Sequence, residues 1–222
     1  MTTILSHSRA RSVYDRIGRL QDTQAFYEDR AVDILFERGD FEHAHVVVEF
    51  GAGTGRHAAR LLGTRLPARA TYQGYDVSPK MVETASRRLL PWGPRARVTL
   101  TDGSPQLELP DGSVDRVLST YVVDLLSEQD VRSFLRSAHR VLRPGGRLCL
   151  ASAAPGETVL SRVVMGSMAM AQHACPALVG GCRPLDLRPF FADNTWRVLH
   201  SENVRVFGIS SQAIVAEPVQ SP

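Results

Sequence analysis

Apolar residues in this chain follow two patterns, short continuous runs and repeats with helical spacing, which alternate along the sequence. The runs predict strands at residues 46–50, 70–75, 97–100, 114–120 and 147–152. The repeats predict helices at residues 24–36, 57–66, 78–89 and 128–142, the third of them capped by Ser78 with Pro79 in its first turn. Strands that alternate with helices predict an α/β fold, with helices on both faces of a parallel sheet.

The C-terminal part of the chain has a different pattern. Residues 196–206 and 211–217 read as two extended segments joined by Phe207, Gly208 and Ile209. They predict a hairpin that completes the sheet. Residues 153–195 show no clear period, so we expect an irregular segment between the strand at 147–152 and the hairpin.

Composition narrows the class of protein. A chain of 222 residues is long enough for one α/β core and short for two, and its net charge of +3 comes without a dense basic run. Nucleic acid is therefore not an expected partner. Three cysteines, no apolar N-terminal leader and no apolar run of membrane-spanning length favour a cytoplasmic protein without a disulfide framework.

The most informative segment is the glycine loop 51–55, which lies between a predicted buried strand and a predicted helix. Its three alternate glycines let the backbone turn tightly and approach a ligand closely. Read from Gly53, the segment fits the dinucleotide pattern G-x-G-x-x-A, with Asp76 in the position of the acid that binds ribose. Read from Glu49, it is an acid at a strand end followed by three alternate glycines.

The second interpretation resembles motif I of the class I S-adenosylmethionine-dependent methyltransferases. Residues 75–81 resemble that family's D-x-S-x-x-M motif, residues 101–104 its adenine-contacting position, residues 115–121 its motif IV, and residues 142–146 its L-R-P-G-G signature. The resemblance covers about residues 44–152. It implies a Rossmann-like three-layer sandwich around a seven-stranded, mainly parallel sheet with an antiparallel last strand.

The same resemblance implies roles for individual residues. Asp76 would accept hydrogen bonds from the ribose hydroxyls, Asp102 would accept one from the adenine amino group, and Glu49 would support the loop and the cofactor's ammonium. An N-terminal tyrosine, Tyr14, would close over the cofactor. The expected cofactor-binding residues are Tyr14, Glu49, Gly51, Ala52, Gly53, Gly55, Asp76, Val77, Ser78, Met81, Asp102, Gly103, Ser104, Ser119 and Thr120.

The reaction expected from the resemblance is methyl transfer to a small, partly apolar acceptor, as in the quinone- and phospholipid-methylating branch. Tyr121, Asp124 and His173 are candidate catalytic residues, although Asp124 could equally cap the next helix. Residues 119–122 depart from the Asn/Asp-Pro-Pro-Tyr/Phe motif of enzymes that methylate nucleobases. No metal is expected, because His173, Cys175 and Cys182 lack the paired spacing of a metal site.

The expected domain is single and covers residues 1–222. It would comprise an N-terminal helical cap (1–40), a cofactor-binding core (44–152), an acceptor-side insert (153–195) and the C-terminal hairpin (196–218). A monomer and a homodimer both remain open, as does a peripheral contact with lipid. Two alternatives to the methyltransferase are an NAD(P)-dependent oxidoreductase and a non-catalytic protein that binds S-adenosylmethionine.

Overall fold

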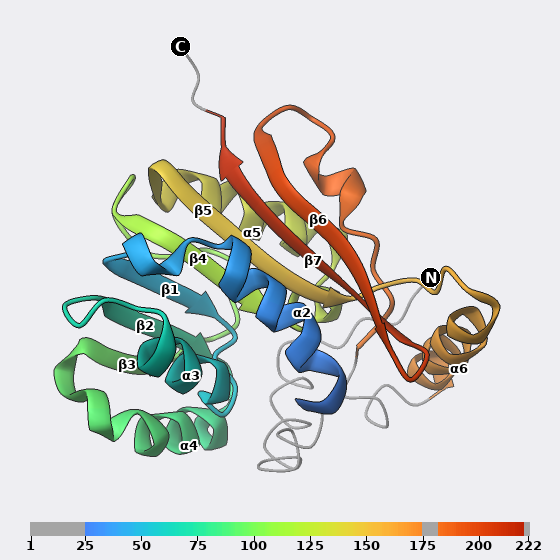
Figure 1. Ribbon diagram of the computed structural model, residues 1–222, viewed down its shortest axis with the longest axis horizontal. Coiled ribbons are helices and arrows are strands. Elements are labelled where there is room, and N and C mark those ends of the chain that lie inside the picture. The colour runs from blue at the N-terminus through green and yellow to red at the C-terminus, as the bar shows by residue number, and fades with distance from the viewer. Residues whose placement is uncertain (1–24, 175–181, 220–222) are drawn as a thin grey trace.

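The computed structural model describes residues 25–174 and 182–219, shown in colour in Figure 1. Its strands are β1 (Val46–Phe50), β2 (Thr71–Asp76), β3 (Ala96–Leu100), β4 (Val114–Thr120), β5 (Leu142–Ala153), β6 (Trp196–Val206) and β7 (Ile209–Pro218). Its α-helices are α2 (Ala25–Arg38), α3 (Arg56–Thr64), α4 (Pro79–Leu89), α5 (Glu128–Val141) and α6 (Val159–Ala174). Short 3₁₀ turns are η2 (Phe41–His43), η3 (Leu90–Arg95), η4 (Val123–Leu125) and η6 (Arg188–Phe191).

All seven strands form one sheet in the order β3-β2-β1-β4-β5-β7-β6. The pairs from β3 to β5 are parallel, whereas β7 runs antiparallel to both β5 and β6. This arrangement confirms the predicted Rossmann-like fold with an antiparallel last strand. The chain reverses its direction across the sheet between β1 and β4, which is where open α/β sheets bind their ligands.

Helices cover both faces of the sheet (Figure 1). Neighbouring strand residues alternate between the two apolar cores because their side chains point to opposite faces. Val47 belongs to the core beneath α2 and α3, and Val48 belongs to the core beneath α5. Both side chains are at most 1% exposed, so β1 is covered on both faces as its apolar sequence predicts.

Hydroxyl side chains begin two of the helices. Ser78 caps α4 by accepting a hydrogen bond from the Met81 amide (3.2 Å), and Pro79 follows it, as predicted. Ser127 caps α5 by accepting from the Asp130 amide (3.0 Å). The alternative in which Asp124 caps this helix is therefore wrong. Asp124 lies in η4 and is completely buried, because the polypeptide makes a further turn before α5 begins.

The C-terminal hairpin is confirmed, with a tighter turn than expected. Phe207 and Gly208 alone separate β6 from β7, and both have positive φ angles, of 50° and 84°. Positive φ at both central residues is the geometry of a two-residue hairpin loop that matches the twist of its strands. Ile209 therefore begins β7 instead of belonging to the turn.

The prediction that residues 153–195 are irregular is wrong, because α6 and η6 lie there. The helical period of α6 is masked by large apolar residues that remain exposed, among them Val159 (79%) and Leu160 (64%). Met165, in contrast, is buried, and the Ser210 amide of β7 donates to its sulfur (3.3 Å). The helices in the described part of the chain include none long and apolar enough to cross a membrane.

Candidate functional site

The glycine loop connects β1 to α3 at the carboxyl edge of the parallel strands. The Gly51 and Ala52 amides both donate to the Tyr75 carbonyl of β2 (2.8 and 2.9 Å). Gly51, Gly53 and Gly55 have φ angles of 82°, 52° and 72°. A Cβ atom on Gly51 would lie 2.2 Å from Cγ2 of Val122, so this position tolerates no side chain.

Asp76 ends β2 and connects the glycine loop to the start of α4. Its Oδ2 accepts from the Gly53 amide (2.8 Å) and its Oδ1 accepts from the Ser78 amide (2.9 Å). The side chain is 9% exposed. The structure thus brings together the loop and the acid that the sequence predicts as neighbours, at the edge where a bound nucleoside would lie.

Glu49 lies behind the loop rather than at its surface. It is 1% exposed, and the Tyr72 hydroxyl donates to its Oε2. Burial raises the pKa of Glu49 to about 8, assisted by the negative charge of Asp76 and opposed by the hydrogen bond from Tyr72. Glu49 is therefore largely protonated at neutral pH, and its side chain is buried behind the loop with Tyr72.

The loop after β3 holds the predicted adenine-side residues. Asp102 is exposed, and its Oδ1 accepts from the Ser104 amide (2.8 Å) in a local turn around Gly103, whose φ is 92°. The Thr101 amide donates to the Asp76 carbonyl (2.9 Å). Asp102 and Asp76 thus lie on neighbouring strand ends, as the motif order predicts.

Other predicted cofactor residues have contacts within the fold. The Ser119 hydroxyl donates to the Phe50 carbonyl (2.9 Å), and Met81 is buried in the core. Val77 is half-buried beside Ser78. Tyr14 lies outside the described residues. The backbone of His173 belongs to α6, but its side chain lies outside what the structure describes.

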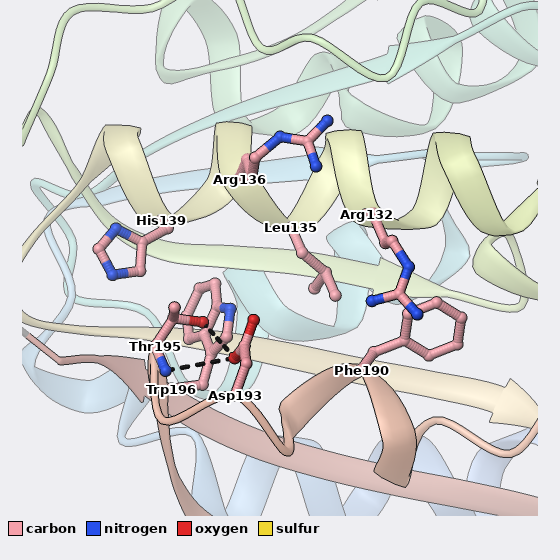
Figure 2. A pocket seen from close by; sticks show the side chains of 8 residues that line it. All are labelled: Arg132, Leu135, Arg136, His139, Phe190, Asp193, Thr195 and Trp196. Carbon is pink, nitrogen blue, oxygen red and sulfur yellow. Dashed lines mark hydrogen bonds between the residues drawn. The ribbon is translucent and has the colours of Figure 1, made fainter.

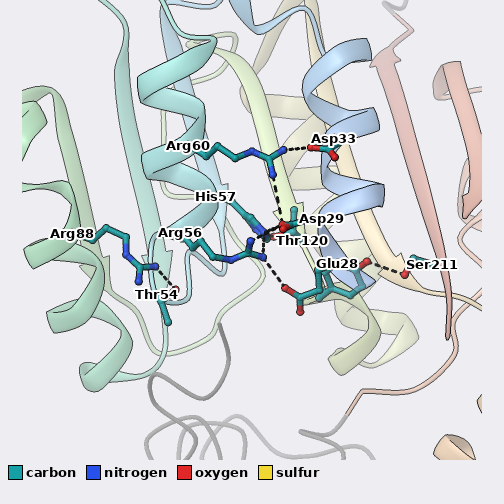
Figure 3. Close-up of polar contacts among 11 residues, drawn as sticks. Glu28, Asp29, Asp33, Thr54, Arg56, His57, Arg60, Arg88, Thr120 and Ser211 are labelled. Carbon is teal, nitrogen blue, oxygen red and sulfur yellow. Dashed lines mark hydrogen bonds and ion pairs between the residues drawn. The ribbon is translucent and has the colours of Figure 1, made fainter. Parts of the chain in front are cut away.

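A pocket opens between the glycine loop, the end of β4 and α2. Its lining consists of Glu28, Gly51, Ala52, Gly53, Thr54, Arg56, His57, Thr120 and Tyr121. Figure 3 shows Arg56 of α3 reaching toward α2, where it pairs with Asp29 (2.5 Å) and Glu28 (3.4 Å). These ion pairs hold α2 against the loop, so the N-terminal helix forms one wall of the pocket.

Behind this wall lies an acidic and aromatic cluster, comprising Tyr27, Glu28, Tyr121, Asp124 and Cys182. The rings of Tyr27 and Tyr121 meet edge to face at 5.8 Å, and the Tyr121 hydroxyl donates to Oγ of Ser211 (2.8 Å). Tyr121 has a φ of 55°, the left-handed conformation that turns the chain out of β4. Its side chain is fixed by these contacts.

The two carboxyl groups of the cluster are shielded from water. Burial raises the pKa of Glu28 to about 7, opposed by the charge of Arg56 and assisted by that of Asp124. Burial also raises the pKa of Asp124 to about 6. Neither oxygen of Asp124 has a partner of good hydrogen-bond geometry among the described residues, although the Cys182 thiol interacts with it. Buried acids of this kind gather at functional sites.

Sequence reasoning missed Glu28, although a signal for it exists. Glu28 precedes Ala31, Val32 and Leu35 by three, four and seven positions, and those three side chains are completely buried. A carboxylate in that register lies on the apolar face of its helix, where a charged group is expensive to bury. The unusual position of Glu28 on the apolar face of the helix can therefore be recognised from the sequence alone.

A second pocket of about 310 Å³ lies on the other face of the sheet, between α5, η6 and the start of β6 (Figure 2). Arg132 lies over the Phe190 ring (5.0 Å), and His139 meets Trp196 edge to face (5.3 Å). None of the glycine-loop residues lines this pocket. It is therefore separate from the site at the strand ends.

Comparison with known proteins agrees with this geometry. Residues 47–146, which include β1, the loop, Asp76 and Asp102, match the family model described as a methyltransferase domain. This stretch of the chain is therefore similar to known methyltransferase domains. The family resemblance seen in the motifs is thereby confirmed. The dinucleotide interpretation of the same loop is not favoured.

Two curated relatives match part of this chain. Methyltransferase GfsG of Streptomyces halstedii is 34% identical over 125 residues, which cover 55% of this chain and 43% of the relative. Demethylmenaquinone methyltransferase of Tropheryma whipplei (strain Twist) is 37% identical over 109 residues, which cover 46% of this chain and 39% of the relative. The chain thus spans less than half the length of either protein in these matches.

Solved structures share the fold over the whole chain. The [4+2]-cyclase SpnF superposes with a TM-score of 0.73 at 17% identity, covering 99% of this chain and 100% of that one. Geranyl diphosphate C-methyltransferase from Streptomyces coelicolor A3(2), solved with Mg²⁺, geranyl diphosphate and S-adenosyl-L-homocysteine, gives a TM-score of 0.70 at 13% identity, covering 99% and 100%. At these identities the likeness concerns the fold alone, and the fold hosts more than one chemistry.

Proposed function

We propose that this chain is an S-adenosylmethionine-dependent methyltransferase that acts on a small, partly apolar acceptor. The observation that carries the proposal is the Asp76 carboxylate, which joins the amide of Gly53 to the start of α4 at the carboxyl edge of the sheet. The methyltransferase family of residues 47–146 supports it. So does the bound S-adenosyl-L-homocysteine of the geranyl diphosphate C-methyltransferase, whose fold this chain shares.

The residues fit this cofactor on structural grounds. Positive φ at Gly51, Gly53 and Gly55 leaves backbone without side chains beside Asp76. Carboxylate oxygens accept more than one hydrogen bond, so Asp76 can serve the ribose hydroxyls as well as the loop. Asp102, exposed at the next strand end, is the corresponding acceptor for the adenine amino group. When bound, the cofactor supplies a methyl group on a positively charged sulfur.

The protein's contribution to such a reaction is alignment and exclusion of water. α2 covers the pocket beside the loop and is held there by the ion pairs of Arg56 with Glu28 and Asp29. Thr120 and Tyr121 line the pocket at the end of β4, where we expect the acceptor to bind. Tyr121, fixed by Ser211 and Tyr27, is suited to shaping the pocket there.

We assign the acceptor to the class of small molecules with an apolar part. The partial match to demethylmenaquinone methyltransferase agrees with a quinone-like acceptor. Exposed apolar residues on α6, Val163 (66%) and Met170 (74%), leave a peripheral contact with lipid open. Cys149 and Cys182 are free buried thiols, in keeping with a reducing, cytoplasmic location.

Labelled methyl transfer tests the proposal. Protein incubated with S-[methyl-³H]adenosylmethionine and a metabolite extract of the organism that encodes the chain is expected to transfer label to a small molecule. Heat-inactivated protein and an extract without protein are the controls. Cofactor binding without any transfer of label would instead support the non-catalytic binding protein, and a cyclase like SpnF would also leave the label on the cofactor.

A further inference from the structure

Glu28 lines the pocket beside the glycine loop. Among the described residues that line this pocket, it is the single acid, and Thr120 and Tyr121 line the same pocket. Its side chain is 5% exposed, so little water competes for its oxygens. A carboxylate in a dry pocket next to a methyl donor is placed to receive a proton.

The other basic or acidic groups of the pocket are engaged elsewhere. Arg56 has only donors, so the contact of its guanidinium with Nε2 of His57 (2.7 Å) makes that nitrogen the acceptor. The Nδ1 of His57 then donates to the Thr120 hydroxyl (3.2 Å). Tyr121 donates its hydroxyl to Ser211, and burial raises the pKa of Tyr121. These contacts engage both ring nitrogens of His57 and the hydroxyl of Tyr121.

Asp124 of η4 is not among the described residues that line the pocket, but its charge acts on Glu28. It is 0% exposed, and its oxygens have no well-oriented partner among the described residues. A negative charge in the protein interior makes a second negative charge nearby more costly. Its charge therefore favours the protonated form of Glu28, while the charge of Arg56 limits that effect.

We propose that Glu28 is the general base of the methyl transfer and that the acceptor therefore carries a proton on the attacking atom. This inference rests on the proposed function and names its substrate class: a hydroxyl, such as a phenol or hydroquinone, or a carbon acid. A nucleophile without a proton to lose, such as a thioether or a pyridine nitrogen, would need no such base.

The step balances in atoms and charge. The proton of the acceptor passes to an oxygen of the Glu28 carboxylate. The electron pair left on the acceptor atom forms the bond to the methyl carbon. The pair of the broken methyl–sulfur bond stays on sulfur, whose positive charge is thereby neutralised. Glu28 is left as a neutral acid, and it returns its proton to solvent after the product leaves.

The proton affinity of Glu28 depends on groups from every element around it. On its own helix these are Tyr27 and Asp29. The groups from the other elements are Arg56 and His57 of α3, Tyr121 after β4, Asp124 of η4 and Cys182 before η6. Of these, Arg56, Asp124 and Asp29 act most strongly on Glu28. Substitution of Asp124 is therefore the most direct way to change the base without touching it.

Infrared difference spectroscopy tests the base without an acceptor. Subtracting the Glu28→Gln spectrum from the wild-type spectrum across pH isolates the protonated carboxyl band of Glu28, with an expected midpoint about 7. In Asp124→Asn the midpoint should fall by about half a pH unit or more, because a neighbouring negative charge is lost. A midpoint below 5 in the wild type, or no shift in Asp124→Asn, would overturn the inference.

Transfer assays test the substrate class. Labelled S-adenosylmethionine is offered 1,4-naphthohydroquinone, catechol and 4-hydroxybenzoate in one set, and dimethyl sulfide and nicotinamide in the other. We expect label in the first set, and a loss of about 100-fold or more in Glu28→Gln. The matched control is Glu37→Gln, an exposed glutamate on the same helix, which should stay within about twofold of the wild type.

The affinity for S-adenosylhomocysteine distinguishes a failure of the proposed function from a failure of the base assignment. It should change less than about threefold in Glu28→Gln, since a base for the acceptor contributes little to cofactor binding. If the wild type fails to bind this product, the proposed function itself fails. The wild type could instead bind this product but methylate only the proton-free acceptors, or no acceptor of either set. In that case, or if Glu28→Gln keeps full transfer activity, the assigned base and acceptor class are wrong. Should Glu28→Gln not fold, the pH–rate midpoint of Asp124→Asn decides instead.

Discussion

Single carboxyl groups determine much of the site. Asp76 and Glu49 lie at the ends of adjacent strands, yet burial gives them different roles. Asp76 reaches the edge and accepts two backbone hydrogen bonds, whereas Glu49 is enclosed with Tyr72. The motifs at residues 49–55 and 75–81 predicted that Glu49 and Asp76 lie beside one loop, and the structure places them there. The motifs could not reveal that Glu49 is enclosed, because that depends on Tyr72 from the next strand.

Glu49 makes stability depend on pH. Its pKa is raised from 4.5 to about 8 in the folded chain, so the native state binds more protons than the unfolded state between those values. This contribution is full below pH 4.5 and is lost as pH rises toward 8, by roughly 5 kcal/mol at most.

Glu49→Gln removes the titration while keeping an acceptor for the Tyr72 hydroxyl. Urea unfolding at pH 5, 6, 7 and 8 should show that the stability advantage of the wild type over this variant decreases with pH. Glu28 and Asp124 are present in both proteins, so their titrations cancel in the difference. Parallel stability curves for the two proteins would contradict the assignment.

At the scale of the elements, the sequence predicts some helices more clearly than others. Ser78 and Pro79 predict the start of α4, because a capping serine and the fixed φ of proline act on the adjacent residues alone. α6 was missed because its exposed apolar residues hide the face that packs on β7. A helix cap can be predicted from neighbouring residues in the sequence. The face of a helix that packs on a strand far away in the sequence cannot be predicted in this way.

A glycine in the turn between β6 and β7 and a glycine within α6 form a matched pair for testing the turn. Gly208 has a φ of 84°, and a Cβ there would lie 2.9 Å from Cγ2 of Val164. Gly208→Ala should lower the free energy of unfolding by about 1–3 kcal/mol. Gly166 lies within α6, and no described atom lies within 4 Å of its Cβ position. Gly166→Ala should raise stability by up to about 1 kcal/mol. Chemical denaturation measures both, and equal effects would contradict the described turn.

At the scale of the whole molecule, segments distant in the sequence meet at one edge of the sheet (Figure 1). The glycine loop and Asp76 come from the core, Glu28 comes from α2, and Cys182 comes from the segment before η6. The motifs of the core predicted the fold and the order of its landmarks. The sequence singled out Asp124 and Tyr121 as candidates, but it could not show that they gather with Glu28 and Cys182, because these residues share no local spacing and meet through tertiary packing alone.

Calorimetric titration with S-adenosylmethionine and, separately, with NADH tests the central claim most directly. The wild type is expected to bind S-adenosylmethionine and not NADH. Asp76→Asn should weaken that binding about 10- to 100-fold, because charge-assisted hydrogen bonds to the ribose are lost. Asp111→Asn, at a 79% exposed carboxylate paired with Arg140, should leave it unchanged. Tight binding of NADH without binding of S-adenosylmethionine, or full affinity in Asp76→Asn, would contradict the account.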